Sequence, residues 1–324
     1  MYEHKIAFIL DKNYFLNPHL EPDTSFFLMK ECCLRDMAVY AITVDNLFLT
    51  GNKVESIAYR INFEGFNLKL PASGKKISLN ELDTVLFRVN PPITMNYMFS
   101  LNILDYIDQS KTIVINSPYG IRKVNEKLYI NNFTDIVPKS IVSSNLIIIK
   151  DFVREIEKTV IKPLDNYGGN GIFYLKYDDR NLNSIIEIAT NNGETPVLIQ
   201  EYLNRIYLGD KRIVLLGKEP AAAIIRIPQK DDFRANMCRG GSLQPAEITD
   251  QDREICKKVS NRLLNDGIFF AGLDIIDNKL TEINVTSPGF FIRKINPLLN
   301  IRLEEKIVDY MECLKPHIKE VKND

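Results

Sequence analysis

Acidic residues interrupt two otherwise apolar runs near the end of the chain. The stretch 272–288 reads GLDIIDNKLTEINVTSP, in which Asp274, Glu282 and Asn284 carry the oxygen atoms that a hard cation prefers. Mg²⁺ typically takes one or two carboxylates and completes its coordination with water and phosphate oxygens. We therefore expect a metal site here, and an exposed hairpin face that carries solvated carboxylates is the alternative.

Two strands must position these side chains. Both arms of the stretch have the length and β-branched content of strands, and the Asp-Asn pair at 277–278 is typical of a chain reversal. Alternation along the second arm places Glu282 and Asn284 on one face. A three-residue loop at 277–279 would set Asp274 opposite Glu282, whereas a two-residue loop would turn it to the other face. We predict the three-residue loop.

The loop 162–171, KPLDNYGGNG, is a second stretch suited to chemistry. Its three glycines let backbone N–H groups approach phosphate oxygens closely, and Lys162 at the end of a strand supplies a positive charge. The spacing differs from that of a P-loop and no helix follows, so neither a Walker site nor a Rossmann fingerprint applies. A glycine-containing hairpin loop without a ligand is the alternative.

Four further features indicate nucleotide or anion binding. Lys127 lies off the apolar face of an expected helix and is free to reach a ligand. The segment 200–203, QEYL, could contact a purine through its backbone. The loop 231–241 carries two arginines and ends in glycines, as do loops that close over anionic substrates. Arg88 ends an expected strand, where it either binds an anion or forms a surface salt bridge.

The composition is that of a globular protein of two or three domains. The chain has 324 residues, of which 45% are apolar and 26% charged, and its net charge is −1. No basic cluster interleaved with aromatic residues indicates nucleic acid binding, and no apolar run reaches the ~18 residues of a membrane span. The first residues lack the pattern of a signal peptide. We therefore expect a cytoplasmic protein with no nucleic acid and no membrane as partner.

Cysteines and histidines exclude several kinds of site. The five cysteines are odd in number and lack CxxC spacing, so we expect reduced thiols rather than disulfides or a zinc site. The three histidines lie in terminal or loop-like surroundings, and no serine or cysteine has one of them at a suggestive spacing. The chemistry should therefore proceed without a triad.

The remaining patterns predict an α/β domain followed by α+β units. The first part has strands at 5–10, 39–44, 83–88 and 111–116, and helices at 24–36 and from Ser117-Pro118 to Leu128, the latter with Ile121 and Val124 on its apolar face. The next part has strands at 159–162, 171–176 and 196–201, and helices at 145–158 and 182–191. The last part has strands at 213–216 and 221–227, a helix at 251–265 with a capping box of Thr249 and Asp252, the acidic hairpin and a final amphipathic helix.

The order of these motifs resembles that of ATP-grasp ligases, and more narrowly that of the bacterial glutathione synthetase family. The resemblance covers almost the whole chain and is most specific at 280–288, LTEINVTSP. The other matching segments are 125–128, 162–165, 168–169, 209–212, 226–229 and 272–276.

This resemblance implies a fold and a reaction. The fold would combine α/β and α+β parts: an ATP-grasp fold with a Rossmann-like pre-ATP-grasp domain at 1–122, a small lid domain at 123–203, and a C-terminal mixed-sheet domain at 204–324 for metal and substrate. The reaction would be the ADP-forming ligation of glycine to γ-glutamylcysteine through an acyl phosphate, which yields glutathione and phosphate. ATP with Mg²⁺ or Mn²⁺ would be the cofactors, and the protein would be a homo-oligomer.

The resemblance also implies roles for single residues. The catalytic contacts to the phosphoryl group and the acyl phosphate would come from Arg212, Arg226 and Arg234. The nucleotide would be held by Lys127, Lys162, Gly168, Gly169, Gln200, Glu201, Tyr202, Leu203 and Asp210. The donor substrate would be bound by Arg88, Asn236 and Ser287, and the metal ion by Asp274, Glu282 and Asn284.

Three segments depart from the family pattern. The family usually has Lys-Asp where this chain has Val89-Asn90, and Gly-Met where it has Asn166-Tyr167. The segment 289–294, GFFIRK, is bulkier and more basic than the family run. Because two of these changes lie where substrate should bind, a ligase with another carboxylate or amine substrate is one alternative. A nucleotide-binding relative without turnover is another.

Overall fold

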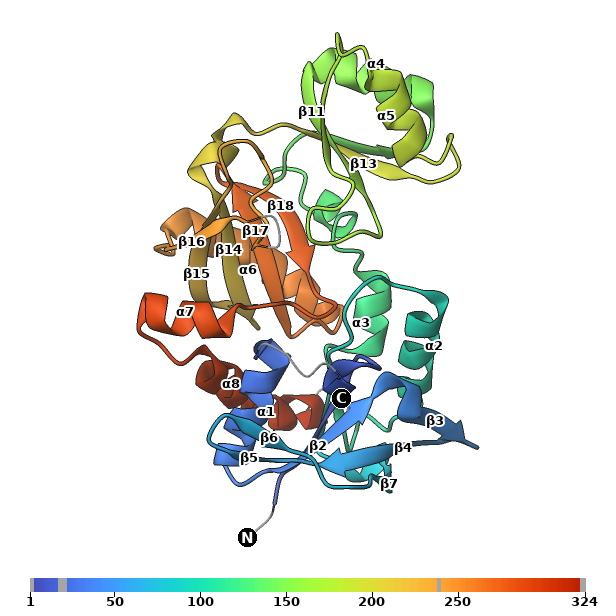
Figure 1. Cartoon of the computed structure of the whole chain (residues 1–324), viewed down its shortest axis with the longest axis vertical. Coiled ribbons are helices and arrows are strands. Elements are labelled where there is room, and N and C mark those ends of the chain that lie inside the picture. Colours follow the sequence, from blue (N-terminus) through green and yellow to red (C-terminus); the bar gives the residue numbers. More distant parts are fainter. Residues whose placement is uncertain (1–2, 17–21, 238–239, 321–324) are drawn as a thin grey trace. The chain divides into compact units, whose positions relative to one another are not determined.

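The chain forms two compact units, each with its own sheets (Figure 1). The computed structural model describes residues 3–16, 22–237 and 240–320, without the side chains of 315–320. Unit 1 contains 1–123, 262–271 and 285–324, and unit 2 contains 124–261 and 272–284. Short 3-10 helices are η1 (Tyr14–Leu16), η2 (Val44–Asn46), η3 (Leu79–Glu81), η4 (Tyr129–Asn132) and η5 (Asn204–Leu208).

Unit 1 is built on a seven-stranded sheet whose centre is parallel. The parallel strands lie in the order β2-β1-β8-β9 and are β1 (Lys5–Leu10), β2 (Ala38–Thr43), β8 (Thr84–Phe87) and β9 (Ile113–Ile115). They are buried along nearly their whole length, as expected for a parallel sheet covered on both faces. The sequence predicts all four within two residues of their ends.

An antiparallel extension of this sheet is absent from the sequence prediction. It consists of β3 (Leu47–Thr50), β4 (Lys53–Arg60) and β7 (Lys75–Ser78), and β5 (Asn62–Glu64) pairs with β6 (Asn67–Lys69) in a separate hairpin. Charged and polar residues occupy much of β4 and β7, which extend an edge of the sheet and are only half buried. Such short strands lack the apolar runs that identify the central strands.

Several helices of unit 1 begin after a residue whose side chain caps them. The helices are α1 (Thr24–Leu34), α2 (Met95–Leu104), α3 (Pro118–Lys123), α7 (Ile292–Leu299) and α8 (Leu303–Glu320). Asp23 accepts a hydrogen bond from the Phe26 N–H at 2.8 Å, and Thr94 accepts one from the Tyr97 N–H at 3.2 Å. Both contacts satisfy N–H groups that have no partner within the helix.

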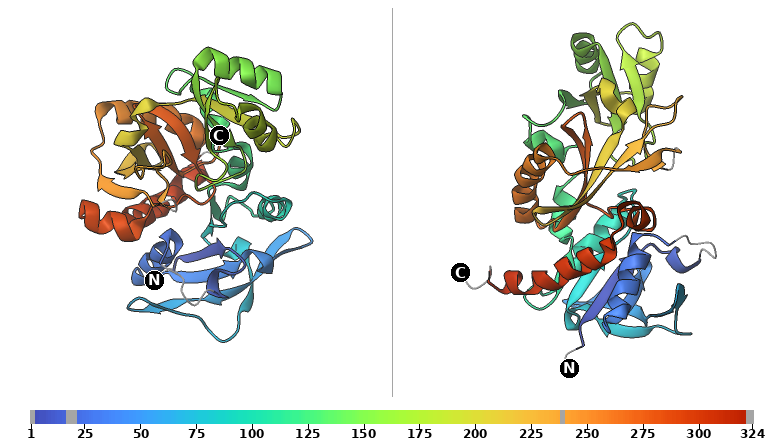
Figure 2. Two further views of the ribbon diagram at one scale, coloured as in Figure 1. Left: turned by 45° about the horizontal axis from the view of Figure 1, so that its top comes forward. Right: turned by 90° about the vertical axis from the view of Figure 1, so that its left-hand side faces the viewer.

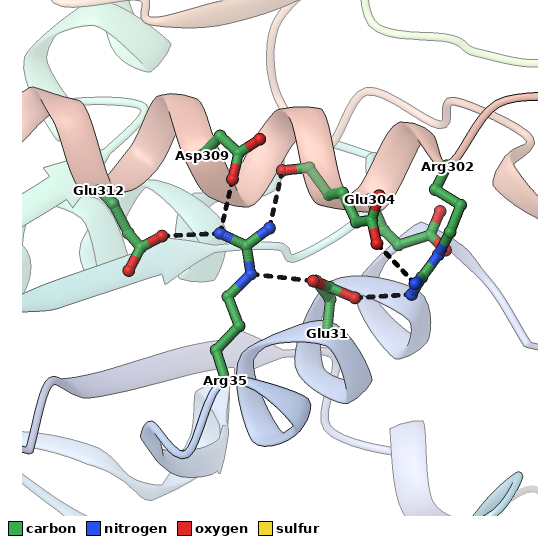
Figure 3. Close-up of polar contacts among 7 residues, drawn as sticks. Glu31, Arg35, Arg302, Glu304, Asp309 and Glu312 are labelled. Atoms are coloured by element: carbon green, nitrogen blue, oxygen red, sulfur yellow. Dashed lines mark hydrogen bonds and ion pairs between the residues drawn. The ribbon is translucent and has the colours of Figure 1, made fainter.

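The last helix of the chain packs on the first (Figure 3). Arg35, which follows α1, donates to Glu31 at 2.8 Å, to Asp309 at 2.6 Å and to Glu312 at 2.7 Å. Arg302, before α8, donates to Glu31 at 2.9 Å. The segment predicted as a third domain, 204–324, is therefore divided between the two units, with α7 and α8 in unit 1.

The predicted helix from Ser117 to Leu128 is shorter in the structure, because α3 ends at Lys123. The Asn125 carboxamide oxygen accepts hydrogen bonds from the N–H groups of Lys127 at 3.1 Å and Leu128 at 3.0 Å. This side chain competes with the helical pattern and replaces it by a local turn. Lys127 is therefore not on a helix face but in a turn, where it is 4% exposed.

Unit 2 contains a four-stranded antiparallel sheet in the order β10-β13-β11-β12. Its strands are β10 (Ser140–Ser143), β11 (Lys158–Pro163), β12 (Phe173–Lys176) and β13 (Val197–Glu201). Two amphipathic helices, α4 (Leu146–Ile156) and α5 (Leu182–Ala189), lie on one face of it (Figure 1). Ile149 and Val153 of α4 pack there in the same core as Ile161 and Leu175 of the sheet.

The second sheet of unit 2 has five strands in the order β16-β15-β14-β17-β18. They are β14 (Asp210–Leu216), β15 (Glu219–Ile227), β16 (Ser242–Pro245), β17 (Phe270–Ile276) and β18 (Lys279–Asn284). The helix α6 (Asp250–Asn265) covers one face (Figure 2). Its capping box is confirmed, since Thr249 Oγ1 accepts from the Asp252 N–H at 3.2 Å and Asp252 Oδ2 from the Thr249 N–H at 2.9 Å.

The hairpin β17–β18 corrects the predicted loop and keeps the predicted facing of its acids. The loop has two residues, because Asp277 and Asn278 both take a positive φ (49° and 60°) and Ile276 pairs with Lys279. This turn type matches the twist of paired strands. The register then shifts between Asp274 and Ile275, so that Ile275 pairs with Leu280 and Asp274 with Glu282. The bulge at Thr281 therefore restores the facing that the short loop alone would reverse.

Candidate active site

Four charged residues of the five-stranded sheet form a cluster in unit 2. The β14–β15 register places Asp210 opposite Arg226, whose Nη2 contacts Asp210 Oδ2 closely and donates to Asp274 Oδ2 at 2.9 Å. Arg212 approaches the same carboxylate, with Nε close to Asp274 Oδ1 and Nη2 at 2.9 Å from Oδ2. Arg212, Arg226 and Asp274 are at most 6% exposed. Two arginines thus converge on one buried carboxylate.

A glycine makes room for this arrangement. A Cβ at Gly272 would lie 3.0 Å from Arg212 Nη1 and 3.1 Å from its Cδ. Any side chain here would press on the guanidinium that contacts Asp274, because real Cβ atoms rarely come so close to other atoms. An alanine at position 272 would therefore require the Arg212 side chain to shift by a few tenths of an ångström.

The cluster leaves polar atoms without partners. Among the described residues, Asp210 Oδ1 and Arg226 Nε are buried and make no hydrogen bond. Burial raises the pKa of Asp210 to about 7 against the opposing effect of Arg226. Burial alone would also raise the pKa of Asp274, but Arg212 and Arg226 outweigh it and lower this pKa to about 2. Buried groups left unsatisfied cost free energy, so they mark a place for a polar ligand.

Glu282 lies across the hairpin from Asp274 and faces a lysine. Lys127 Nζ lies 3.2 Å from Glu282 Oε1 and donates to the Asn166 carbonyl oxygen at 2.6 Å. Burial opposes the charge of Lys127, yet Glu282 and Glu126 raise its pKa. Lys127 thus joins the acidic hairpin to the glycine loop 162–171 through Asn166, a contact that the sequence does not predict.

The predicted metal ligands fit a hard cation. Asp274 and Glu282 pair across the hairpin, and Asn284 Nδ2 donates to Asp274 Oδ2 at 3.2 Å. Two carboxylates and one amide are too few for a site made of protein ligands alone, and no group of three or more His, Cys, Asp or Glu suited to a metal occurs in the described part of the chain. They are enough for Mg²⁺ that also takes water and phosphate oxygens.

Lys162 and Gln200 meet on the four-stranded sheet. Lys162 Nζ donates to Gln200 Oε1 at 2.8 Å, and burial lowers the pKa of Lys162. Gln200 is 1% exposed, and its Nε2 has no hydrogen-bond partner among the residues described. A half-buried lysine and an unpaired amide donor can serve a ligand that carries both negative charge and acceptor atoms.

The segment 200–203 uses part of its backbone within the sheet. The Glu201 N–H donates to the Lys139 carbonyl at 2.8 Å, and the Tyr202 N–H donates to the Lys158 carbonyl at 2.9 Å. These two N–H groups are therefore already engaged within the protein.

Arg234 and Asn236 lie against the glycine loop. Arg234 Nη1 donates to the Gly169 carbonyl oxygen at 3.1 Å, while its Nε and Nη2 bind Asp232. Gly168 and Gly169 have positive φ (65° and 77°), and a Cβ at Gly169 would lie 2.6 Å from Asn236 Oδ1. Only glycine fits this approach without strain. Residues 238 and 239 of the predicted loop lie outside the described residues.

Arg88 belongs to unit 1, as does Ser287. Arg88 follows β8 at the carboxyl edge of the parallel sheet. The chain leads from β1 to β2 on one side and from β8 to β9 on the other, and ligands of open α/β sheets bind at such switch points. Arg88 is 3% exposed, and its Nε and Nη2 donate to Ser25 Oγ at 3.1 Å and the Pro288 carbonyl at 3.2 Å. Ser287 Oγ donates to the Arg88 carbonyl at 3.4 Å.

The alternative prediction, that Arg88 forms a surface salt bridge, is wrong. No carboxylate of the described residues forms an ion pair with it, and its Nη1 is buried without a partner there. Burial lowers the pKa of this guanidinium. Ser25 is a contact that sequence reasoning missed, although Asp23-Thr24-Ser25 carries the cap signal that places this hydroxyl at the start of α1.

The departures near the substrate positions have structural partners. Phe290 is fully buried, with its ring 5.9 Å from that of Phe270, and its N–H donates to Thr24 Oγ1 at 3.0 Å. Asn90 Nδ2 donates to Asp11 Oδ2 at 2.6 Å. The bulk at Phe290 is therefore core packing, and the amide at Asn90 pairs with an acid.

His4, the histidine whose side chain the structure describes, lies outside this cluster. His4 Nε2 lies 3.1 Å from Thr84 Oγ1 in unit 1, His19 lies outside the described residues, and the side chain of His317 is not among those described. An open cavity of about 580 Å³ between α6 and the hairpin turn contains none of the predicted site residues. Three acids and three lysines line it, so it selects no ligand charge.

Solved structures identify the fold. A D-cycloserine synthetase superposes with a TM-score of 0.64 at 13% identity, covering 97% of this chain and all of that one (100%). The ATP-grasp ligase PsnB, in a complex with a precursor variant, Mg and ADP, superposes with a TM-score of 0.62 at 14% identity, covering 97% and 99%. The chain therefore has the ATP-grasp fold.

Protein-family models and similar sequences assign the chain to one family with this fold. Residues 4–122 match the N-terminal domain and residues 126–300 the ATP-grasp domain of prokaryotic glutathione synthetase. Glutathione synthetases of Nostoc sp. and Coxiella burnetii are 39% and 34% identical, each over 95% of this chain and over 98% and 96% of their own lengths. The chain belongs to the prokaryotic glutathione synthetase family, and it is an ADP-forming carbon–nitrogen ligase. No helix in the described ranges is long and apolar enough to cross a membrane.

Proposed function

We propose that this chain joins glycine to γ-glutamylcysteine at the expense of ATP, giving glutathione, ADP and phosphate. The observation that supports the proposal most is the buried Arg212–Asp274–Arg226 cluster beside Glu282 and Lys127, since it combines cations for phosphate with oxygen ligands for Mg²⁺. Membership of the glutathione synthetase family supports the choice of substrates.

The reaction needs charge neutralisation and alignment rather than a nucleophilic side chain. A carboxylate is a poor acceptor for an amine, so its oxygen first takes the γ-phosphoryl group of ATP, with loss of ADP. The glycine nitrogen then attacks the carbonyl carbon of this acyl phosphate, and phosphate leaves with the electron pair of the broken C–O bond. The absence of a usable histidine among the described site residues agrees with this chemistry.

Each side chain has a proposed role in that sequence. Lys127, Lys162, Gly168 and Gly169 would bind the phosphates, and residues 200–203 with Asp210 would hold the nucleoside. Arg212 would stabilise the transferring phosphoryl group, and Arg226 and Arg234 would bind the acyl phosphate. Asp274, Glu282 and Asn284 would hold Mg²⁺, which when bound neutralises charge between the phosphates.

The pairing of the site's cations with its acids has a consequence for binding. Lys127 is held by Glu282, and Arg212 and Arg226 are held by Asp274. A nucleotide must compete with these acids for the cations, and the metal ion must compete with the cations for the acids. ATP and Mg²⁺ should therefore bind with strong mutual dependence, since each releases the partner that the other needs.

The donor carboxylate and the assembly are further parts of the proposal. Arg88, whose Nη1 has no partner among the described residues, would receive a carboxylate of the donor, and Ser287 would contact the donor in the same unit. Asn236 is a further residue that we propose binds the donor. The predicted domain 1–122 would carry Arg88, and the predicted domain 123–203 would carry most contacts to the nucleotide. The predicted domain 204–324 would carry the metal ligands and the remaining contacts to nucleotide, donor and acyl phosphate. Exposed Met95 and Phe99 on α2 are consistent with a homo-oligomer, and the free thiols of Cys32, Cys33 and Cys256 with the cytoplasm.

The decisive test measures phosphate release and product mass with purified protein, Mg-ATP, γ-glutamylcysteine and glycine. We expect glutathione and phosphate in equal amounts. Absence of phosphate release with both substrates present would overturn the proposal. A panel of other carboxylates and amines separates a ligase of different specificity, whereas tight ATP binding without hydrolysis under every substrate would indicate the relative without turnover.

A further inference from the structure

Three aromatic rings from separate segments meet in unit 2. Tyr174 lies on β12, Tyr202 follows β13, and Phe233 lies in the segment 228–237 between β15 and β16, here called the substrate loop. The ring centroids of Tyr174 and Tyr202 are 4.7 Å apart, and Phe233 lies 6.1 Å from Tyr202 and 6.4 Å from Tyr174. Their planes are inclined by 59° to 76°, which is a favourable geometry for aromatic rings.

The residue after Phe233 makes the second contact of the substrate loop. Arg234 Nη1 donates to the Gly169 carbonyl oxygen at 3.1 Å, and Asn236 Oδ1 occupies the space beside the same glycine. The substrate loop therefore touches the four-stranded sheet at two places: the aromatic residue that follows Gln200 and Glu201, and the glycine loop. Both places lie in segments to which the proposed function assigns the nucleotide.

We propose that Phe233 is a positioning residue that couples nucleotide binding to the placement of Arg234. A nucleotide held by 200–203 and 162–171 orders Tyr202 and Gly169, and these are the groups against which Phe233 and Arg234 dock. The inference rests on the proposed function, because it uses its assignment of these segments to the nucleotide. It goes beyond that function by giving a role to Phe233, to which the proposed function assigns no contact with a reactant.

The sequence around Phe233 explains why the coupling needs this ring. Its neighbours Lys230 and Asp231 are exposed and polar, and Phe233 is the aromatic side chain of the described substrate loop. An aromatic pair of this kind changes an equilibrium by about 2- to 10-fold. Two such pairs are enough to shift a short loop between docked and undocked positions.

Limited proteolysis with trypsin tests the coupling, with cleavage after Lys230 and Arg234 identified by fragment mass. The probe is Mg-ADP, so the test does not depend on glycine or γ-glutamylcysteine. For the unaltered protein we expect saturating Mg-ADP to slow cleavage at both positions at least ~10-fold. Phe233→Ala should lose most of this protection, and Phe233→Tyr should retain it.

Reciprocity adds a second readout. If docking and nucleotide binding are coupled, Phe233→Ala also weakens the affinity for Mg-ADP. The factor by which the affinity falls should not exceed the factor by which Mg-ADP protection against trypsin falls. Phe173→Ala is the matched control, because Phe173 is a partly exposed phenylalanine beside Tyr174 on β12. It should keep both the protection and the affinity of the unaltered protein.

Several outcomes would overturn the inference. One is full protection of Phe233→Ala by Mg-ADP; another is equal loss of protection in Phe173→Ala. Phe233→Leu guards against a fold defect, since it keeps apolar bulk without a ring, and wild-type protection in this variant would also refute the role of the ring. If Mg-ADP does not bind the unaltered protein at all, the proposed function itself fails.

The ratio of phosphate to glutathione released during turnover provides a further test. A purely structural role of Phe233 would leave this ratio unchanged. With the loop undocked, water reaches the acyl phosphate, so Phe233→Ala should release more phosphate than glutathione, while the unaltered protein and Phe173→Ala keep a ratio near one. An unchanged ratio in Phe233→Ala contradicts the positioning of Arg234.

Discussion

Two clusters of arginines and acids differ in burial and in completeness. In unit 2, Arg212, Arg226 and Asp274 are at most 6% exposed, and Arg226 Nε and Asp210 Oδ1 have no partner among the described residues. In unit 1, the cluster between α1 and α8 is partly exposed, and each guanidinium nitrogen of Arg35 is engaged (Figure 3). Only the first cluster has capacity left for a ligand.

The difference follows from what burial does to charge. Removing charges from water costs several kcal/mol per ion, and ion pairs recover this only when all their hydrogen-bonding atoms are satisfied. An incomplete buried cluster is therefore poor as a stabilising element and well suited to bind phosphate and metal. An exposed, complete cluster contributes little per pair and serves to fasten two helices.

The largest expected effect is on turnover. Glu282→Ala removes a proposed metal ligand and frees Lys127, so Mg-dependent phosphate release should fall at least ~100-fold, with the fold retained. Glu254→Ala, an exposed acid on α6, is the control and should leave the rate unchanged. Activity that survives in Glu282→Ala shows that the metal assignment is wrong.

Asp274→Asn should have the largest effect on stability. It leaves two buried arginines without their shared anion, so the free energy of unfolding should fall by ~3 kcal/mol in urea titrations. Asp309→Asn in the exposed cluster is the comparison and should cost less than ~1 kcal/mol. Similar losses for the two variants would contradict the distinction between the clusters.

Asp210 should make stability depend on pH. Its pKa is raised in the folded state to about 7 from an ordinary value of 3.8, so the unfolded chain loses this proton first. The free energy of unfolding that this group contributes therefore falls as pH rises from 3.8 to about 7. Asp210→Asn should flatten that decline in urea titrations at pH 5 and pH 7.5. An identical slope in the variant would show that Asp210 ionises normally.

The smallest effect should come from the helix fastening. Arg35→Ala removes contacts to three acids at the surface of α1 and α8, and we expect a loss of about 1 kcal/mol or less with unchanged turnover. High salt should lower the free energy of unfolding of the unaltered protein by a similar amount, because surface ion pairs are screened. The same salt should lower that of Arg35→Ala by less. A loss above ~3 kcal/mol in the free energy of unfolding would show that this cluster stabilises the fold as strongly as the buried one.

Much of the fold could be predicted from the chain because its elements carry strong local signals. Apolar runs predict the central parallel strands, and the Thr249–Asp252 box predicts the start of α6. The edge strands between 47 and 78 mix charged, polar and apolar residues, and the helix α2 is largely apolar around its circumference, so none of them carries such a signal. Nothing local indicates that α8 packs on α1.

The acidic hairpin shows where sequence and tertiary structure divide. The residue types and their order, with two lysines, a glycine loop and an arginine before the hairpin, predicted that oxygen ligands for a metal ion and cations for phosphate act together. Which face Asp274 takes depended on a turn and a bulge, because a shift of one residue reverses every side chain of a strand. Which cation holds each acid depended on strands and turns distant in sequence, since Lys127 and Arg212 meet Glu282 and Asp274 only through folding.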